Sequence, residues 1–139
     1  MTDQELMDMA KKAAEYAYVP YSKFPVGAAL ECSDGTVFTG CNVENAAFTP
    51  TSCAERTALF KAVAEGVTRF TDIAVVGARR GEVNKQITSP CGVCRQVMRE
   101  FCGDDFRIYL VNDKGFETVT LAQLLPYGFT AGEHMSANK

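Results

Sequence analysis

Two short segments of the chain carry residue types that could bind a metal ion and move protons. The first is Cys-Ala-Glu-Arg at residues 53–56, and the second is Pro-Cys-Gly-Val-Cys-Arg-Gln at residues 90–96. Both are typical of the first turn of a helix, and they supply three thiolates, from Cys53, Cys91 and Cys94, and one carboxylate, from Glu55. Three sulfurs on a tetrahedral zinc ion leave one position open, as in a catalytic rather than a structural site. The sequence therefore predicts a hydrolytic zinc centre.

Glu55 is the candidate proton carrier of this centre. It lies two positions after Cys53 in the predicted first turn, which places its carboxylate near the open metal position without making it a ligand. There it could take a proton from zinc-bound water and pass it to a leaving group. A carboxylate that only stabilises the helix dipole is the alternative. The three cysteines favour the catalytic role.

Arg56 and Arg95 are candidates to offset the negative charge that three thiolates bring to a zinc ion. Arg56 follows Glu55 and Arg95 follows Cys94, so each could hydrogen-bond a sulfur and withdraw charge from it. The alternative for both is a surface arginine that pairs with an acidic side chain.

Other uses of the cysteines are less consistent with the sequence. A thioredoxin-like dithiol also has Cys-x-x-Cys, but it needs neither a third thiol nor an upstream Cys-x-Glu. A structural zinc site would need a fourth ligand, and the only histidine, His134, lies in a polar tail. The remaining cysteines, Cys32, Cys41 and Cys102, are expected to be small buried side chains.

The elements that must position these residues follow from hydrophobic periodicity, helix caps and turn residues. Helices are predicted at about 3–17, 54–65 and 91–101, and strands at 26–30, 36–41, 73–77, 107–111 and 117–121. Thr2 and Glu5 form a predicted capping box, and residues 33–35 predict a hairpin turn. The last two strands are predicted to be antiparallel because a parallel pair needs a crossover of about a dozen residues or more.

This order of elements predicts an α/β fold, a three-layer α/β/α sandwich with a mixed five-stranded sheet. The helices at 54–65 and 91–101 would leave the same end of the sheet, so their N-termini would meet. The partial positive charge of helix N-termini lowers the pKa of cysteines and favours thiolates there. The fold is thus expected to assemble the zinc centre from distant residues.

Length and composition narrow the class of protein. With 139 residues, 47% of them hydrophobic, the chain is expected to form one domain over residues 1–139, with a frayed tail after about residue 132. A net charge of -3, with acidic and basic residues interspersed, argues against a nucleic-acid partner. The polar N-terminus lacks the apolar segment of a signal peptide, and no stretch could span a membrane. We therefore expect a cytoplasmic protein with reduced cysteines.

The two cysteine segments resemble the signature of the small zinc-dependent cytidine deaminases. The resemblance covers nearly the whole chain. Residues 21–24, 26–30, 40–46, 57–60 and 124–126 are similar to the homotetrameric form of that family. The resemblance implies hydrolytic deamination of cytidine and deoxycytidine to uridine and deoxyuridine with release of ammonia, in pyrimidine salvage, by a zinc-dependent homotetramer.

The resemblance also implies roles for individual residues. Cys53, Cys91 and Cys94 match the zinc ligands, Glu55 the proton shuttle, Asn42 and Glu44 the pair that holds the ribose hydroxyls, Phe24 the ring that packs on the pyrimidine, Ala54 the backbone contact to the base, and Phe129 an aromatic that reaches into a neighbouring subunit's pocket. From the residues alone, Phe24 would be core, Asn42 and Glu44 part of a turn, and Phe129 an anchor for the chain end.

Two residues differ from the pattern of the family, and three alternative functions remain open. Phe48 stands where many relatives have tyrosine, and Val93 fills a position that is often smaller, which puts subunit contacts and substrate tuning in question. A blasticidin-type deaminase is similar in its zinc motifs, but residues 24–28 and 42–45 favour a free nucleoside. The charge and the short final hairpin disfavour a polynucleotide deaminase. A noncatalytic zinc-binding interaction module is the alternative from another class.

Overall fold

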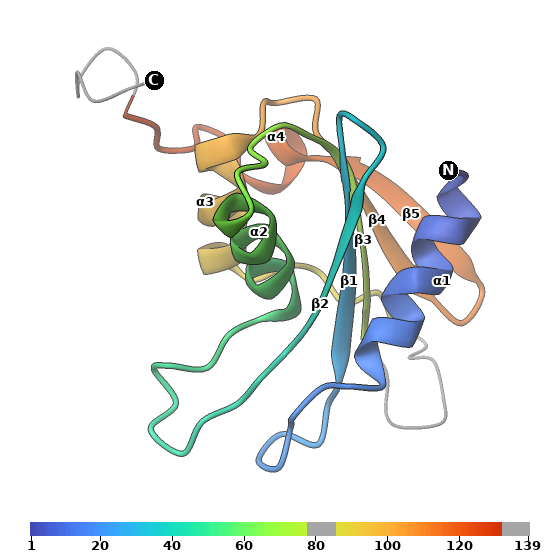
Figure 1. The fold of residues 1–139 in the computed structure, drawn as a ribbon, viewed down its shortest axis with the longest axis vertical. Coiled ribbons are helices and arrows are strands. Elements are labelled where there is room, and N and C mark those ends of the chain that lie inside the picture. Colours follow the sequence, from blue (N-terminus) through green and yellow to red (C-terminus); the bar gives the residue numbers. More distant parts are fainter. Residues whose placement is uncertain (78–85, 132–139) are drawn as a thin grey trace.

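The computed structural model describes residues 1–77 and 86–131. Its elements are α1 (Asp3–Ala14), β1 (Val26–Cys32), β2 (Val37–Cys41), α2 (Ala54–Ala64), β3 (Phe70–Gly77), α3 (Gly92–Phe101), β4 (Arg107–Asn112), β5 (Gly115–Thr120) and α4 (Leu121–Leu124). Helix α1 covers one face of the sheet, and α2, α3 and α4 lie on the other side (Figure 1). The predicted three-layer α/β/α fold is confirmed.

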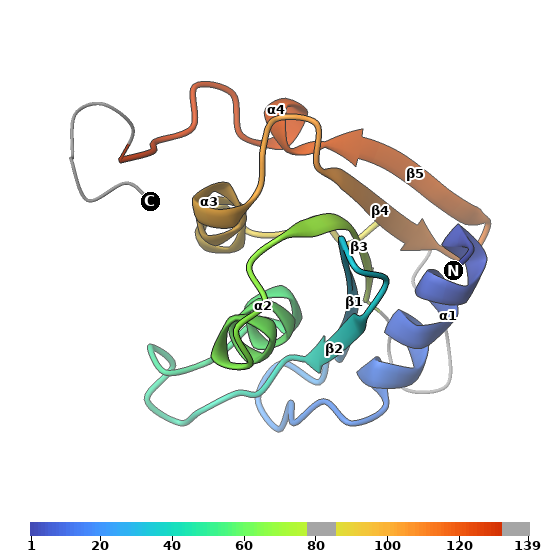
Figure 2. The same ribbon diagram turned by 45° about the horizontal axis from the view of Figure 1, so that its top comes forward.

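The five strands form one mixed sheet in the order β2-β1-β3-β4-β5 (Figure 2). Strand β1 pairs antiparallel with β2 and β3, β4 pairs antiparallel with β5, and β3 and β4 are parallel. Helix α3 lies between β3 and β4 in the chain and provides the crossover that a parallel pair requires. Both predicted antiparallel hairpins are therefore confirmed.

Two glycines in the first hairpin let helices approach the sheet closely from opposite faces. A Cβ atom on Gly27 would overlap the Ala10 carbonyl oxygen of α1. A Cβ atom on Gly40 would lie 2.5 Å from the Ala54 carbonyl oxygen of α2, closer than real Cβ contacts. Gly40 thus sets the distance between β2 and the first turn of α2, directly after Cys53.

Two hydrophobic clusters fill the spaces on the two sides of the sheet. One lies against α1 and includes Leu6 and Met7, and the other lies against α2 and α3 and includes Leu59 and Met98. These four side chains are almost completely buried, and each contributes roughly 1.5–3 kcal/mol by leaving water. The second cluster holds α2 and α3 on the same face of the sheet.

The first helix is shorter than predicted. Its capping box of Thr2 and Glu5 is present, but α1 ends at Ala14 rather than near residue 17. The chain turns there because the Tyr18 N–H already donates to the Asn42 carbonyl oxygen at 3.0 Å, in an extended pairing. Tertiary pairing therefore overrides the helical periodicity of the last residues.

The last strand also ends earlier than predicted. Leu121 was expected to close it, but β5 ends at Thr120 and Leu121 begins the short helix α4. Thr120 and Gln123 form a capping box, and this local sequence pattern is typical of the first turn of a helix. The helix matters because its C-terminal carbonyls lie near α3.

Several predictions concern other parts of the chain. A surface loop is predicted from the polar residues 79–89, and residues 79–85 of it lie outside the described residues, as do the tail after residue 132 and His134. Cys32 and Cys102 are buried as expected, whereas Cys41 is half-buried. Across residues 1–77 and 86–131, no helix is long and apolar enough to cross a membrane.

Candidate metal centre and active site

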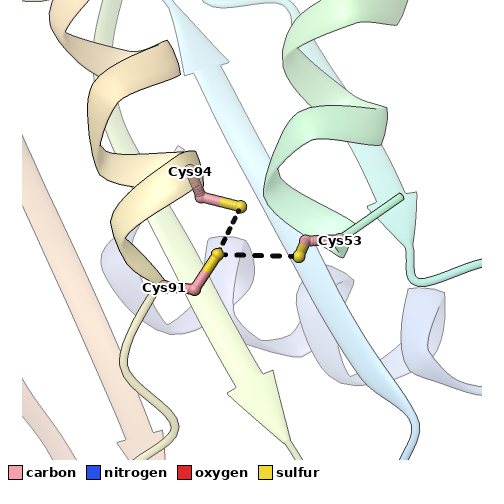
Figure 3. A group of neighbouring side chains, drawn as sticks. All are labelled: Cys53, Cys91 and Cys94. Carbon is pink, nitrogen blue, oxygen red and sulfur yellow. Dashed lines mark hydrogen bonds between the residues drawn. The ribbon is translucent and has the colours of Figure 1, made fainter. Parts of the chain in front are cut away.

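The first turns of α2 and α3 bring three cysteines together, with their sulfur atoms facing one another (Figure 3). Cys53 is the N-cap of α2, Cys91 is the N-cap of α3, and Cys94 lies in the first turn of α3. Neither N-cap side chain makes a capping hydrogen bond to the backbone of its own helix, so both thiols can face the neighbouring helix. The Cys91 sulfur lies 3.9 Å from the Cys53 sulfur and 3.6 Å from the Cys94 sulfur.

The spacing of the sulfur atoms fits a zinc ion. All three lie within 4.8 Å of one another. Sulfurs bound at about 2.3 Å to one tetrahedral zinc ion lie roughly 3.8 Å apart, close to the two separations above. In the described part of the chain, no fourth cysteine, histidine or carboxylate joins the group. The donor set therefore suits zinc with one position open to water or substrate.

The electrostatics of the cluster concentrate negative charge on one sulfur. A hydrogen bond with Cys94, followed by interactions with Arg56, lowers the pKa of Cys53 to about 5. The hydrogen bond with Cys53, together with burial, raises the pKa of Cys94. Neighbouring sulfurs thus compete for a single negative charge. A dication between them would allow all three to ionise, since metal coordination deprotonates thiols.

The two candidate arginines differ in what they contact. Arg56 Nη2 donates to the Cys53 sulfur at 3.3 Å and to the Thr51 carbonyl oxygen at 3.2 Å. Arg95 donates to no cysteine sulfur: its partners are the Pro90 and Leu124 carbonyl oxygens and a serine hydroxyl. The expectation that Arg95 would bond a sulfur is therefore wrong. Its hydrogen bonds connect the loop before α3 to the end of α4.

Glu55 lies in the first turn of α2 and is only 4% exposed. Burial, with a smaller contribution from the nearby Cys53 charge, raises the pKa of Glu55 to about 7. A carboxyl group with this pKa has access to both protonation states near neutral pH, which suits a group that first accepts and then donates a proton.

Asn42 and Glu44 hold the segment that leads into β1. Asn42 Oδ1 accepts from the Val26 N–H at 2.8 Å, and Asn42 Nδ2 donates to the Phe24 carbonyl oxygen at 3.0 Å. Glu44 Oε1 accepts from the N–H groups of Tyr21 and Ser22 at 3.0 and 3.1 Å. This supporting role could not be predicted from local sequence, because the partners lie 16 to 23 positions away.

Phe24 lies against the C-terminal end of β3. A Cβ atom on Gly77 would overlap the Thr88 hydroxyl and approach the Phe24 ring to 2.7 Å, so the last residue of β3 leaves space for both side chains. Phe24 is half-buried, and Ala54 is fully buried in the first turn of α2. The importance of Gly77 was missed, although a glycine in a buried strand often marks a close approach.

The remaining candidate residues lie on the surface. The Phe129 side chain is 69% exposed, and Gln96 Nε2 donates to the Phe129 carbonyl oxygen at 2.9 Å. Phe48 is equally exposed, has φ 64° and packs edge-on against Tyr21, with ring centres 6.0 Å apart. Val93 is also exposed, so its size creates no strain within the chain. All three side chains are therefore accessible at the surface of the chain.

Comparison with known proteins shows what this arrangement is similar to. Residues 1–110 match the family model of the cytidine and deoxycytidylate deaminase zinc-binding region. The cytidine deaminase of Sporosarcina psychrophila is 54% identical over 131 residues, which cover 94% of this chain and 93% of the relative. That of Halalkalibacterium halodurans is 50% identical over 132 residues, covering 94% and 96%.

Solved structures agree with the sequence matches. The crystal structure of cytidine deaminase from Burkholderia pseudomallei has a TM-score of 0.84 and 47% identity, covering 93% of this chain and 100% of that chain. The enzyme from Mycobacterium tuberculosis has a TM-score of 0.78 and 39% identity, covering 94% and 99%. Because the coverage is nearly complete on both sides, the likeness includes both cysteine segments and the sheet that positions them.

Proposed function

The chain belongs to the cytidine and deoxycytidylate deaminase family, and from this membership we propose that it hydrolyses cytidine and deoxycytidine to uridine and deoxyuridine with release of ammonia. The observation that carries the proposal is the pairing of an open three-sulfur cluster with a buried carboxyl group whose pKa is raised to about 7. It gives the chain a metal site and a proton carrier on adjacent helix turns.

The chain's own residues supply most of the chemistry. Cys53, Cys91 and Cys94 would hold zinc, which when bound lowers the pKa of water and makes it nucleophilic near pH 7. Glu55 takes the proton that the attacking water loses as its oxygen bonds to C4 of the cytosine ring. It delivers that proton to ring N3. The new hydroxyl on C4 then gives its proton to the same carboxylate, which passes it to the amine as the bond between C4 and the amine breaks, leaving the carbonyl of the uracil ring and ammonia. Burial keeps Glu55 basic enough to accept and acidic enough to donate.

The substrate would lie over the segment that Asn42 and Glu44 support. Both backbone hydrogen bonds to Glu44 described above use Oε1, and a hydrogen bond with the Ser22 side chain lowers the pKa of Glu44, so Glu44 is a carboxylate that could also accept from a ribose hydroxyl. The Asn42 amide retains a second N–H for the same diol. Phe24 provides a flat apolar wall suited to a pyrimidine, and the backbone of Ala54 would contact the base. Arg56 supports the centre by drawing charge from Cys53.

The finer biological setting is part of the same proposal. We propose that residues 1–139 form one domain and that the protein is cytoplasmic and works in pyrimidine salvage. We also propose that it is a homotetramer in which Phe129 enters the site of a neighbouring subunit. The exposed aromatic side chains of Phe129 and Tyr127, beside α3, support an interface there, because large exposed aromatics are enriched at protein contacts. The matches to nucleoside-acting relatives disfavour a blasticidin-type deaminase and a noncatalytic zinc module.

The test follows the ultraviolet absorbance of cytidine mixed with purified, zinc-loaded protein. The cytidine band should decay, and a zinc chelator should stop the decay. Glu55→Gln should retain zinc but lose about 10²–10⁴-fold in kcat, the usual contribution of a positioned acid–base group. Glu65→Gln is the matched control, since this exposed glutamate lies at the other end of α2, and it should leave kcat unchanged.

Two outcomes would contradict the proposal. Folded, zinc-loaded protein that leaves cytidine and deoxycytidine intact would remove the assigned reaction and direct attention to modified cytosine nucleosides. Turnover by Glu55→Gln close to that of the wild type would remove the shuttle role while leaving the reaction in place.

A further inference from the structure

Arg95 makes a three-way connection at the start of α3. Its Nε donates to the Pro90 carbonyl oxygen at 2.7 Å, its Nη1 to the Leu124 carbonyl oxygen at 2.7 Å, and its Nη2 to the Ser89 hydroxyl at 2.7 Å. All three guanidinium nitrogens are therefore used, at distances typical of charge-assisted hydrogen bonds. Two of the partners immediately precede Cys91, and the third is the last residue of α4.

The position of the Pro90 carbonyl group makes this connection relevant to the metal centre. Pro90 and Cys91 share one peptide group, so a bond to the Pro90 oxygen fixes the backbone from which the Cys91 side chain extends. Cys91 is the most exposed of the three cysteines, and its side chain makes no capping hydrogen bond to the backbone of α3; its contact with that helix is the 3.6 Å approach to the Cys94 sulfur. Packing restrains its sulfur less than it restrains the buried Cys94, so Cys91 depends more on its backbone.

Gln96 extends the connection toward the end of the described chain. Its Nε2 donates to the Phe129 carbonyl oxygen at 2.9 Å. Adjacent side chains on α3 therefore attach residues 124 and 129 to the same helical turn that carries Cys94. The segment after α4 and the two cysteines of α3 form one hydrogen-bonded unit.

We propose that Arg95 is a positioning residue of the zinc centre. By bonding both the Pro90 and the Leu124 carbonyl oxygens, it fixes the Pro90–Cys91 peptide to the end of α4, and it thereby couples zinc retention to the ordered packing of residues 124–129. The inference rests on the proposed function in that it requires the three cysteines to hold zinc. Groups that orient metal ligands typically account for about 10- to 100-fold in metal affinity, and we expect an effect of this size.

The role is one of geometry rather than of charge. Arg56 is the arginine that reaches a sulfur, and Arg95 reaches none. A lysine at position 95 would keep the positive charge, but its single ammonium group lacks the planar fork that spans three separate acceptors. Arg95→Lys should therefore behave like Arg95→Gln, whereas a charge effect would make the lysine variant resemble the wild type.

The test measures how fast zinc passes from loaded, folded protein to a colorimetric chelator. We expect release about 10- to 100-fold faster in both Arg95 variants, and a smaller acceleration in Ser89→Ala, which removes one acceptor. The matched control is Arg99→Lys, one turn further along α3, whose partner is Asp104. It should release zinc at the wild-type rate. If the Arg95 variants fail to fold, Ser89→Ala still tests the proposal, because it removes only one of the three acceptors of Arg95.

Hydrogen exchange tests the coupling itself. Removing zinc from the wild type should speed amide exchange in residues 124–129, because linked equilibria are reciprocal. In Arg95→Lys these amides should already exchange faster and should respond little to zinc removal, a pattern that a purely structural role would not produce.

Three outcomes would overturn the proposal. Wild-type release rates in every variant with an intact zinc load would overturn the positioning role and leave the proposed function standing. If Arg95→Lys released zinc at the wild-type rate while Arg95→Gln released it faster, the positive charge of Arg95 rather than its hydrogen-bond geometry would explain the effect. A wild-type protein that takes up no zinc would remove the proposed function and this inference together.

Discussion

Replacing Gly40 with alanine tests whether the contact between β2 and α2 places the active site. The added Cβ atom would lie 2.5 Å from the Ala54 carbonyl oxygen and 2.6 Å from the Ala58 nitrogen. Both are backbone atoms, so no side-chain rotation can relieve the overlap. The first turn of α2 must move away from the sheet, and Cys53 and Glu55 must move with it.

The magnitude follows from these distances. An ordinary contact begins at 3.4 Å, so α2 must move by about 0.9 Å if the whole adjustment is made by the helix. Overpacking of this kind costs about 1–3 kcal/mol of unfolding free energy, or about 4 °C in Tm for each kcal/mol in a chain of this length. A misplacement of about 1 Å at a reacting group costs roughly 100-fold in rate.

The assay compares Tm, zinc content and kcat for Gly40→Ala with those of Gly92→Ala. Gly92 is the first residue of α3, between two of the cysteines, and a Cβ atom there meets nothing within 4 Å. The same chemical change, made between two of the cysteines, should therefore be neutral or slightly stabilising. Gly40→Ala should lose both stability and most of kcat.

The reasoning would be refuted by a Gly40→Ala protein with wild-type Tm and kcat. An equal loss in Gly92→Ala would also refute it, because proximity to the cysteines rather than the β2–α2 contact would then explain the effect. A fall in Tm without a fall in kcat would confine the role of Gly40 to stability.

Three further predictions use other parts of the site and the sheet. Gly77→Ala should displace the Phe24 ring and raise KM for cytidine more than it lowers kcat; an unchanged KM in steady-state assays would contradict the placement of that ring. Burial, followed by a hydrogen bond with Asp72, raises the pKa of Glu31, so its stabilising contribution is present below the ordinary glutamate pKa and is lost as pH rises through the raised value. Denaturant titrations should therefore show Glu31→Gln gaining stability relative to the wild type as pH rises above the ordinary glutamate pKa, and a constant difference would count against it. Chelation should lower Tm, since zinc binds the folded chain alone, and scanning calorimetry with and without added zinc checks this.

Much of the fold could be predicted from local patterns. The Thr2 capping box, the turn at residues 33–35 and the short connection between the last strands are effects of neighbouring residues, and all appear in the structure. The end of α1 could not be predicted, because it depends on the pairing of Tyr18 with Asn42. Helix α4 could have been predicted from Thr120 and Gln123, whose capping box is local.

The chemistry of the site was determined by residue type in the sequence. Three cysteines and a glutamate at these spacings predict a metal site of sulfur ligands with one open position and a nearby proton carrier, because the chemistry of a thiolate or a carboxylate depends first on the residue type. What the spacing left open was whether Cys53 meets Cys91, 38 positions later. The sheet decided that, by placing α2 and α3 side by side on one face.

Tertiary structure alone decided the environment of each group. The pKa of Glu55 is raised because the fold buries it, and burial depends on what packs around a residue rather than on its sequence neighbours. Arg56 and Arg95 look equivalent in sequence, because each lies beside a candidate site residue. In the structure, Arg56 donates to a cysteine sulfur, whereas Arg95 donates to backbone carbonyl oxygens in the loop before α3 and at the end of α4. The sequence thus determined which chemical groups the protein has, and the packing of helices on the sheet determined which of them meet and in what state of charge.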